Sequence, residues 1–287
     1  MTSNGIIAFF TTSFLTALAM TGCSDLRNPV PTNPAAETEV HPEGWLNVDS
    51  QNFHGRFLQG IGWDLRSCQQ CHGTDYRGGI ADVSCLTCHP ATPEDCVVCH
   101  GGVDNLTGAP PEDLAGNRAE GAVGVGAHSA HLTGEEFSDG IECESCHLVP
   151  DSFYATGHVD SDLPAEVTFS NLTLADSANP TWQRNAATCA NAYCHGNWSL
   201  AKSQSNFSFI YTAEQIEGNA AMPTWTDAAT VVCGTCHDLP PKGHTPFQLT
   251  ECTNCHSSVV DADGNIADKS KHVNGMVNVF GQEFPVF

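Results

Sequence analysis

Fourteen of the 15 cysteines form seven pairs, and in every pair a histidine directly follows the second cysteine. Six pairs have the spacing Cys-x-x-Cys-His: Cys68/Cys71/His72, Cys85/Cys88/His89, Cys96/Cys99/His100, Cys143/Cys146/His147, Cys233/Cys236/His237 and Cys252/Cys255/His256. The seventh, Cys189/Cys194/His195, has four residues between its cysteines. Because the motifs recur along most of the chain, the fold must form around whatever these residues bind.

The histidine that follows each pair indicates haem c. Two thiols at this spacing can add to the two vinyl groups of one haem, and the adjacent histidine can then bind the iron on the proximal side. We expect a single helical turn to bring the two sulfurs to one edge of the ring. The stretched motif needs a bulged loop to reach the same two vinyl groups. The cofactor prediction is therefore seven covalently bound haem c groups.

Two other uses of Cys-x-x-Cys fit less well. A zinc ribbon uses such pairs, and the pairs Cys85/Cys88 and Cys96/Cys99 are close enough in sequence to share a metal. Zinc coordination, however, gives no reason for a histidine after every pair. A thioredoxin-like redox motif occurs once, at a helix start, rather than seven times.

Seven of the 14 histidines lie outside the motifs and are candidate distal ligands. They are His41, His54, His128, His131, His158, His244 and His272. A lone histidine is more often a surface or hydrogen-bonded residue, but one spare histidine per haem is what complete bis-histidine ligation requires. Met222 and Met276 are alternative axial ligands, although packing is the favoured interpretation of both.

Two local patterns refine the distal assignment. His128 and His131 are three residues apart, which would direct both from one helical face towards two neighbouring haems. A weak internal repeat places a proline and then Gly-His after the motifs at Cys143 and Cys233. The repeat predicts equivalent ligand roles for His158 and His244.

The rest of the composition predicts little regular structure. The chain has 26 glycines and 16 prolines, and few windows keep a helical period beyond two turns. Strand-like runs at residues 166–169 and 207–211 are isolated. We predict a mostly irregular fold with short helices, organised around a chain of stacked haems, with little or no extended sheet.

The N-terminus predicts export. Residues 1–22 carry no charged side chain, and the apolar run at residues 6–20 is too short for a comfortable membrane span. Ala19-Met-Thr-Gly-Cys23 resembles a bacterial lipobox, with lipid attached to Cys23. An ordinary signal peptide followed by a chance cysteine is the alternative. Ser24 after the cysteine favours the outer membrane, so we expect an exported outer-membrane lipoprotein on the periplasmic or cell-surface side.

The motifs divide the chain into four parts. The predicted organisation is a lipoprotein signal peptide at 1–22, a flexible linker at 23–40, an N-terminal two-haem module at 41–90 and a five-haem CxxxxCH/CxxCH module at 91–287.

Charge restricts the partners. The chain has 10 Lys and Arg residues and 33 Asp and Glu residues, which gives a formal net charge of −23. Nucleic acid is disfavoured because it requires a cationic surface. Basic redox proteins and extracellular cationic metal acceptors are the expected partners.

Several segments between about residues 96 and 280 together resemble a known family. They are Gly126-Ala-His-Ser-Ala-His131-Leu, Pro164-Ala-Glu-Val-Thr-Phe, Pro180-Thr-Trp, Cys189-x4-Cys194-His-Gly, Pro223-Thr-Trp-Thr, Cys233-Gly-Thr-Cys-His-Asp-Leu-Pro-Pro and His272-Val-Asn-Gly. This pattern resembles the CxxxxCH/CxxCH multihaem c-type cytochromes of metal-reducing bacteria. The resemblance implies a secreted electron-transfer protein that works in the periplasm or at the cell surface, often in respiration to extracellular acceptors.

Electron transfer through bis-histidine haems is the favoured function, and we expect a carrier rather than an enzyme. One alternative is a multihaem reductase, which would need a haem with an open distal side. The other is a structural subunit of an outer-membrane conduit or of a cytochrome filament. Such a subunit would also transfer electrons and would differ from the carrier in its assembly.

Overall fold

The computed structural model describes residues 40–101, 113, 115–160 and 164–286. The predicted signal peptide, the lipidation site Cys23 and the linker up to residue 39 lie outside the described residues. The chain divides into two compact units, residues 1–60 and 61–287. The module boundary between residues 90 and 91 stays a prediction.

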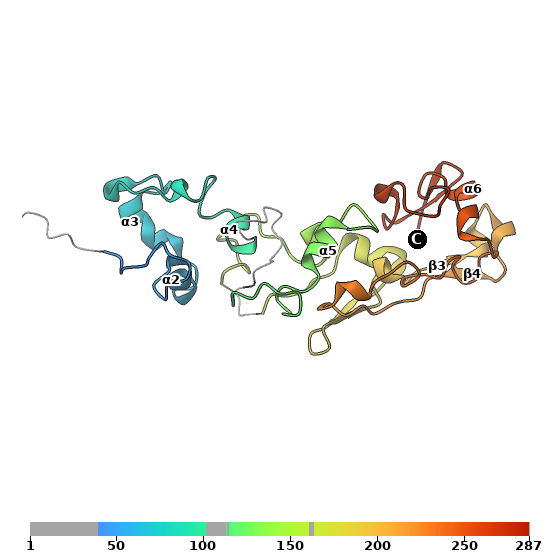
Figure 1. The fold of residues 1–287 in the computed structure, drawn as a ribbon, viewed down its shortest axis with the longest axis horizontal. Helices are drawn as coiled ribbons and strands as arrows, with labels where there is room; N and C mark the ends of the chain where they lie inside the picture. The colour runs from blue at the N-terminus through green and yellow to red at the C-terminus, as the bar shows by residue number, and fades with distance from the viewer. Residues whose placement is uncertain (1–39, 102–112, 114, 161–163, 287) are drawn as a thin grey trace, which may run out of the picture. The chain divides into compact units, whose positions relative to one another are not determined.

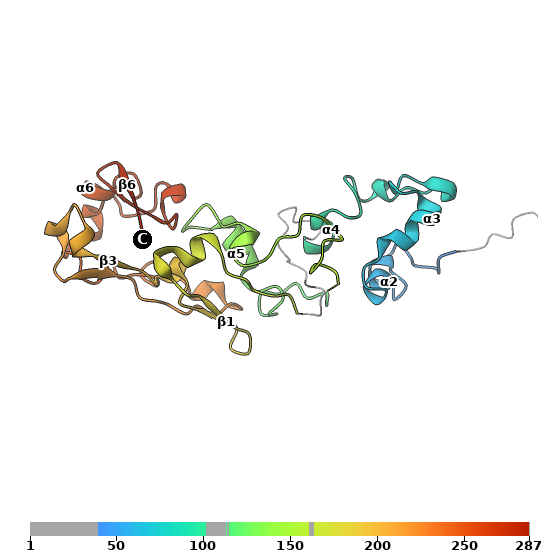
Figure 2. The same cartoon turned by 180° about the vertical axis from the view of Figure 1, so that it is seen from behind.

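Short helices are joined by long irregular segments, as both views of the ribbon show (Figures 1 and 2). The described α-helices are α2 (His54–Gly60), α3 (Gln69–His72), α4 (Cys96–His100), α5 (His128–Thr133) and α6 (Thr253–His256). The 3₁₀ helices are η2 (Leu65–Cys68), η3 (Gly79–Ala81), η4 (Cys85–Thr87), η5 (Cys143–Ser145), η6 (Asn171–Ser177), η7 (Tyr193–His195), η8 (Lys202–Gln204), η9 (Ser208–Ile210), η10 (Ala228–Thr230), η11 (Leu249–Glu251) and η12 (Lys269–Lys271).

Six short strands form three separate antiparallel pairs in the described residues. They are β1 (Thr181–Gln183) with β2 (Thr188–Ala190), β3 (Ser199–Ala201) with β4 (Gln215–Glu217), and β5 (Met276–Val279) with β6 (Gln282–Pro285). No pair joins another into a larger sheet among these residues. The prediction of a mostly irregular fold without an extended sheet is therefore confirmed, although the two predicted strand-like runs are wrong: residues 166–169 form no strand, and η9 replaces one at 207–211.

Six of the seven motifs contain a helical turn, and the residue before the turn often caps it. The Asp95 side chain accepts a hydrogen bond from the Val97 N–H at the start of α4. The Ser84 hydroxyl does the same for η4, through the Leu86 N–H. Side-chain caps satisfy N–H groups that a first turn leaves without partners, so short polar residues start these turns where the cysteines need them. The motif at Cys233 is the exception and forms a non-helical turn.

The stretched motif is built from a strand and a helical turn together. Cys189 lies in β2, opposite Trp182 of β1, and Cys194 lies in η7. Between them Asn191 has a φ of 60°, in the left-handed region that asparagine tolerates. This bend is the bulge expected for the four-residue spacing.

The protein core is thin. In the described residues the buried apolar side chains are Leu65, Tyr76, Val125, Ala127, Ala178, Ala190, Ala192, Tyr193, Tyr211, Ile216, Val259 and Val279. Alanines make up a third of this set. So few large buried side chains cannot account for an ordinary globular core of this length, which agrees with a fold organised around cofactors.

None of the helices in the described parts of the chain has both the length and the hydropathy that a membrane span requires.

Candidate haem-binding sites

Four motif histidines each face a histidine from outside the motifs. The pairs, with the distance between ring centres and the angle between ring planes, are His100–His158 (6.0 Å, 28°), His128–His147 (6.2 Å, 22°), His131–His195 (6.1 Å, 50°) and His237–His272 (6.3 Å, 69°). The two members of each pair come from different segments of the chain. The fold thus brings together the two sets of histidines that the sequence separates.

The last motif has a candidate partner in His244. His256 of α6 is half-buried, and burial lowers its pKa. The bond to the Asn278 carbonyl opposes this shift, whereas the nearby His244 adds to it. His244 therefore lies close enough to His256 to affect its ionisation.

The spacing of the four facing pairs fits an iron between the rings. An imidazole nitrogen lies about 2 Å from a metal that it binds, and the ring centre lies about 1 Å further along the same line. Two imidazoles on opposite faces of one iron therefore have centres roughly 6 Å apart. The other aromatic ring pairs among the described residues range from 4.3 to 6.4 Å. Here the separation stays between 6.0 and 6.3 Å while the angle ranges from 22° to 69°.

The second ring nitrogen supports the same interpretation. In ten histidines Nδ1 lies 2.6–3.0 Å from a backbone carbonyl oxygen. The pairs are His54–Trp45, His72–Val83, His128–Val125, His131–Ala127, His147–Glu166, His158–Phe153, His237–Asp238, His244–Thr245, His256–Asn278 and His272–Phe137.

A carbonyl oxygen only accepts, so Nδ1 must carry the proton in each of these bonds and Nε2 keeps its lone pair. Metal-binding histidines show this arrangement because the second bond fixes both the tautomer and the ring orientation. Six of the seven candidate distal ligands share it, which a set of unrelated surface histidines would not explain. The donor set therefore fits haem iron.

Burial keeps several of these imidazoles neutral, the form that binds a metal. It lowers the pKa of His100, His128 and His272 below the usual value. The effect is largest at His195, where burial and the facing His131 lower the pKa to about 4, against the opposing effect of the Cys189 carbonyl. The stretched motif thus lies in the least polar surroundings of the set.

The cysteines beside His195 show the same effect. Burial raises the pKa of Cys189 to about 11 and that of Cys194 to about 12. Neither forms a disulfide, and no three potential ligands among the described histidines, cysteines and carboxylates converge on one point as a zinc site requires. The pair of facing imidazoles is the recurring arrangement instead.

None of the fourteen candidate attachment cysteines forms a disulfide, and each is either exposed or half-buried. They are Cys68, Cys71, Cys85, Cys88, Cys96, Cys99, Cys143, Cys146, Cys189, Cys194, Cys233, Cys236, Cys252 and Cys255. An accessible thiol can reach a haem vinyl group, whereas a cysteine sealed in a core or paired in a disulfide could not. The set is therefore compatible with attachment, and the assignment of each cysteine stays a prediction.

Exposure differs between the cysteines of the helical motifs. Cys71 in α3 and Cys88, which follows η4, are exposed, whereas Cys255 in α6 is half-buried. The Cys255 carbonyl accepts a hydrogen bond from the Phe280 N–H (2.7 Å), which joins the last motif to the turn between β5 and β6. The first two motifs thus leave their second cysteine more open to solvent than the last one does.

The second motif is a compact turn outside the set of facing pairs. The N–H groups of Cys88 and His89 both donate to the Cys85 carbonyl, at 3.2 and 3.0 Å. This turn brings the second cysteine and the half-buried His89 close to the first cysteine, as haem attachment requires. His89 is not a member of the four facing pairs, so its role as a proximal ligand, and the identity of its distal partner, stay predictions.

Residues 219–221 join the stretched motif to the motif that follows it. The Asn219 N–H donates to the Cys236 carbonyl (2.8 Å), and the Ala221 N–H donates to the His195 carbonyl (2.9 Å). Gly196 makes this approach feasible: its φ is 88°, and a Cβ there would lie 1.9 Å from the Cys236 carbonyl oxygen. The Cys194–His195 and Cys236–His237 turns are therefore held side by side.

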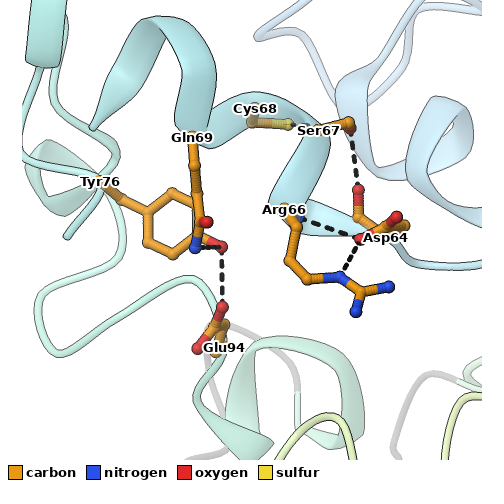
Figure 3. A network of polar contacts seen from close by, with 7 residues as sticks. All are labelled: Asp64, Arg66, Ser67, Cys68, Gln69, Tyr76 and Glu94. Atoms are coloured by element: carbon orange, nitrogen blue, oxygen red, sulfur yellow. Dashed lines mark hydrogen bonds and ion pairs between the residues drawn. The ribbon is translucent and has the colours of Figure 1, made fainter. Parts of the chain in front are cut away.

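Tyr76 links the first and third motifs through its side chain. Its hydroxyl donates to Glu94 Oε1 (2.7 Å) and accepts from Gln69 Nε2 (3.0 Å), as Figure 3 shows. Gln69 lies between the two cysteines of the first motif, and Glu94 precedes Asp95, the cap of α4. Burial and the Glu94 bond raise the pKa of Tyr76 well above its usual value.

The backbone of Tyr76 extends this link to the second motif. Its carbonyl accepts from the Cys85 N–H (3.0 Å) and from the Ser84 hydroxyl (3.4 Å). Tyr76 is only 3% exposed, so these bonds are shielded from water. One tyrosine thus fixes the spacing of three motifs.

Large apolar side chains lie exposed directly beside the motifs. Leu148 and Val149 follow His147 and are 81% and 42% exposed, and Val232 before Cys233 is 61% exposed. An apolar surface of this kind is suited to covering a porphyrin ring.

Three further candidate ligands, His41, His54 and His72, are not members of the four facing pairs. In the first unit the His41 ring stacks on Trp45, with centres 4.3 Å apart, and His54 bonds to the Trp45 carbonyl. In the second unit His72 bonds to the Val83 carbonyl. The assignment of His41 and His54 as distal ligands stays a prediction.

The family comparison covers the two motifs joined by residues 219–221. The model of a family described as Geobacter CxxxxCH...CXXCH motif matches residues 188–237, from the start of β2 to His237. This segment contains both the CxxxxCH motif and the CxxCH motif that the description names. The match confirms the resemblance to CxxxxCH/CxxCH multihaem c-type cytochromes drawn from the sequence, and it supports haem c as the cofactor and electron transfer as the general role. Neither the curated proteins nor the solved structures contain a significant match to the chain.

Proposed function

We propose that this chain is an exported heptahaem c-type cytochrome that transfers electrons through bis-histidine haems in the periplasm or at the outer membrane. The observation that carries the proposal is the recurrence of facing imidazoles at one separation, 6.0–6.3 Å, whatever their relative angle. An iron with two such ligands has no free position for a substrate, but it can still exchange electrons through the ring edge.

The proposed distal ligands follow from the pairs. His158 serves the haem of the third motif, His128 the fourth, His131 the fifth, His272 the sixth and His244 the seventh. His41 and His54 complete the count of seven distal ligands. Covalent haem c supplies an iron that alternates between the ferrous and ferric states. The protein fixes each pair of imidazoles through its Nδ1 bonds, so the ligands need little rearrangement when the charge changes.

The charge of the chain supports a cationic acceptor or a basic redox partner. A net charge of −23 accelerates encounter with positive partners and opposes binding of oxyanions. This favours an electron carrier in extracellular or metal respiration over a reductase of small oxyanions.

Export and anchoring are proposed from residues 1–23. After cleavage before Cys23, two or more acyl chains on that residue would hold the mature protein at the outer membrane. Residues 24–40 would then act as the spacer between lipid and fold.

The haem count is tested by the intact mass of the protein purified from cells that attach haem c. We expect the mass of the acylated mature polypeptide plus seven haems, one for each motif. A mass with six haems would mean that one motif is not used. The variant Cys189→Ser/Cys194→Ser shows whether the unused motif is the stretched one. If it is, this variant has the same six haems as the wild-type protein. The matched control Cys252→Ser/Cys255→Ser should lose one haem in either case.

A further inference from the structure

The ring of Trp225 contacts two candidate distal ligands at once. It lies edge-on to His128, with centres 4.7 Å apart and planes at 83°, and tilted against His131, at 5.5 Å and 37°. His128 faces His147, whereas His131 faces His195. One indole therefore contacts two candidate distal ligands that face two different motifs.

The position of this indole is itself fixed from two sides. Its Nε1 donates to the Val123 carbonyl (2.8 Å), and its backbone N–H donates to the Ala187 carbonyl (2.7 Å). Gly126 lies directly against the ring: its φ is 46°, and a Cβ there would lie 1.9 Å from the indole Nε1. The indole thus connects the loop before α5 to Ala187, the residue before β2. Strand β2 contains Cys189.

The two imidazoles depend on such a contact because their own hydrogen bonds are local. His128 and His131 bond to the Val125 and Ala127 carbonyls, which belong to the same turn or to the residue before α5. Each Nδ1 bond orients one ring relative to its own turn, but it does not relate the two rings to each other. A large flat side chain packed against both rings restricts them together.

We propose that Trp225 is a positioning residue that sets the ring planes of His128 and His131 together, and through them the electronic state of two neighbouring haems. The inference rests on the proposed function, because it requires both histidines to be iron ligands. The planes of axial imidazoles determine how the iron d orbitals split, so they affect the g-values of a ferric low-spin haem and its reduction potential.

The chain contains a matched comparison. Trp198 lies against one motif histidine, His237, with ring centres 6.1 Å apart and planes at 56°. His237 faces His272. Removing the Trp198 ring should therefore affect one haem, whereas removing the Trp225 ring should affect two.

The experiment compares electron paramagnetic resonance spectra of the oxidised holoproteins. His128→Met, His131→Met and His272→Met first identify the signal of each haem by its loss. We expect Trp225→Leu to shift the two signals that His128→Met and His131→Met remove, and to change the midpoint potentials of the same two haems. Trp198→Leu should shift only the signal assigned through His272→Met. Trp225→Phe, which keeps an aromatic ring, should shift the same two signals by less.

Three outcomes would overturn the inference. Trp225→Leu and Trp225→Phe could leave both signals in place, shift only one of them, or shift all signals equally. If Trp225→Leu does not retain its haems, the result with Trp225→Phe decides between these outcomes. Failure of the proposed function is distinguishable, because the wild-type protein would then lack the low-spin signals and neither histidine substitution would remove one.

Discussion

The imidazole rings of His128 and His147 face each other with planes only 22° apart, whereas those of His237 and His272 are 69° apart at nearly the same separation. In a ferric low-spin haem, nearly parallel axial imidazoles give a rhombic spectrum. Nearly perpendicular imidazoles give a single feature at a much larger g-value. We therefore expect the oxidised protein to show both kinds of signal.

The assignment is checked with one substitution. His272→Met should remove the large-g feature and leave the rhombic signals of the His128 and His100 haems unchanged. Persistence of that feature in the variant would show that it comes from another haem, and that the 69° arrangement does not describe the sixth haem.

His158 is expected to serve the third motif rather than the fourth, although it follows the fourth in sequence. His158→Ala should therefore convert one haem to the high-spin form, visible as a weakened Soret band and a charge-transfer band. In the background Cys96→Ser/Cys99→Ser, which lacks the third haem, the same substitution should produce no high-spin haem. A high-spin haem in that background would show that His158 is the distal ligand of a haem other than the third.

Tyr76→Phe removes one hydroxyl and leaves two partners without a bond. Because Glu94 is charged and Tyr76 is buried, we expect the free energy of unfolding in urea to fall by about 1–3 kcal/mol. Glu94→Gln keeps an acceptor oxygen and should cost less. Equal losses for the two variants would mean that the hydrogen bond is not what stabilises this region.

The same hydroxyl predicts a loss of stability in alkali. The pKa of Tyr76 is raised in the folded protein, mainly by burial. The folded state therefore holds the proton more tightly than the unfolded state, and this contribution is fully present below the ordinary tyrosine pKa of about 10. As the pH rises beyond that value, the contribution decreases. Tyr76→Phe should show a weaker decrease in urea midpoint above that pH than wild type, and an identical slope would contradict the assignment.

Gly196 and Gly157 form a matched pair for testing the contact between the fifth and sixth motifs. Their φ angles are 88° and 87°, but a Cβ at Gly196 would clash with the Cys236 carbonyl, whereas one at Gly157 would meet nothing within 4 Å. Gly157→Ala should cost only the backbone strain, about 1–2 kcal/mol. Gly196→Ala should cost at least about 1 kcal/mol more because residues must move apart. Similar urea midpoints for the two variants would show that the close approach is not needed.

The motifs were predictable from the sequence because covalent haem attachment fixes the residue types and their spacing. The helical turns at the cysteines and the bend at Asn191 followed from the same constraint. That His128 and His131 come from one short helix and face two different motifs also agrees with their spacing, because two residues three apart share a helical face.

The pairing between distant segments was not predictable. His158 and His244 occupy equivalent places in the repeat, yet the first faces His100 of an earlier motif and the second lies near His256 of a later one. Local spacing does not determine such contacts, since they depend on where irregular segments return. The three short strand pairs were missed for the same reason: with three or four residues each, they show no sequence period.

The roles of Trp225 and Tyr76 left only weak signals. In the sequence, Trp225 is marked only by its place in a Pro-Thr-Trp segment of the family resemblance, and Tyr76 only by the glycines near it. Neither signal named the partners, because both residues act by joining segments that are far apart in the chain.

The most direct test of the central claim is exposure of the fully reduced protein to carbon monoxide, followed by the Soret band. Carbon monoxide needs an open iron position, and complete bis-histidine ligation leaves none. The account predicts a Soret band that is nearly unchanged. Stoichiometric carbon monoxide binding at one haem would contradict it and would favour a reductase with an open site.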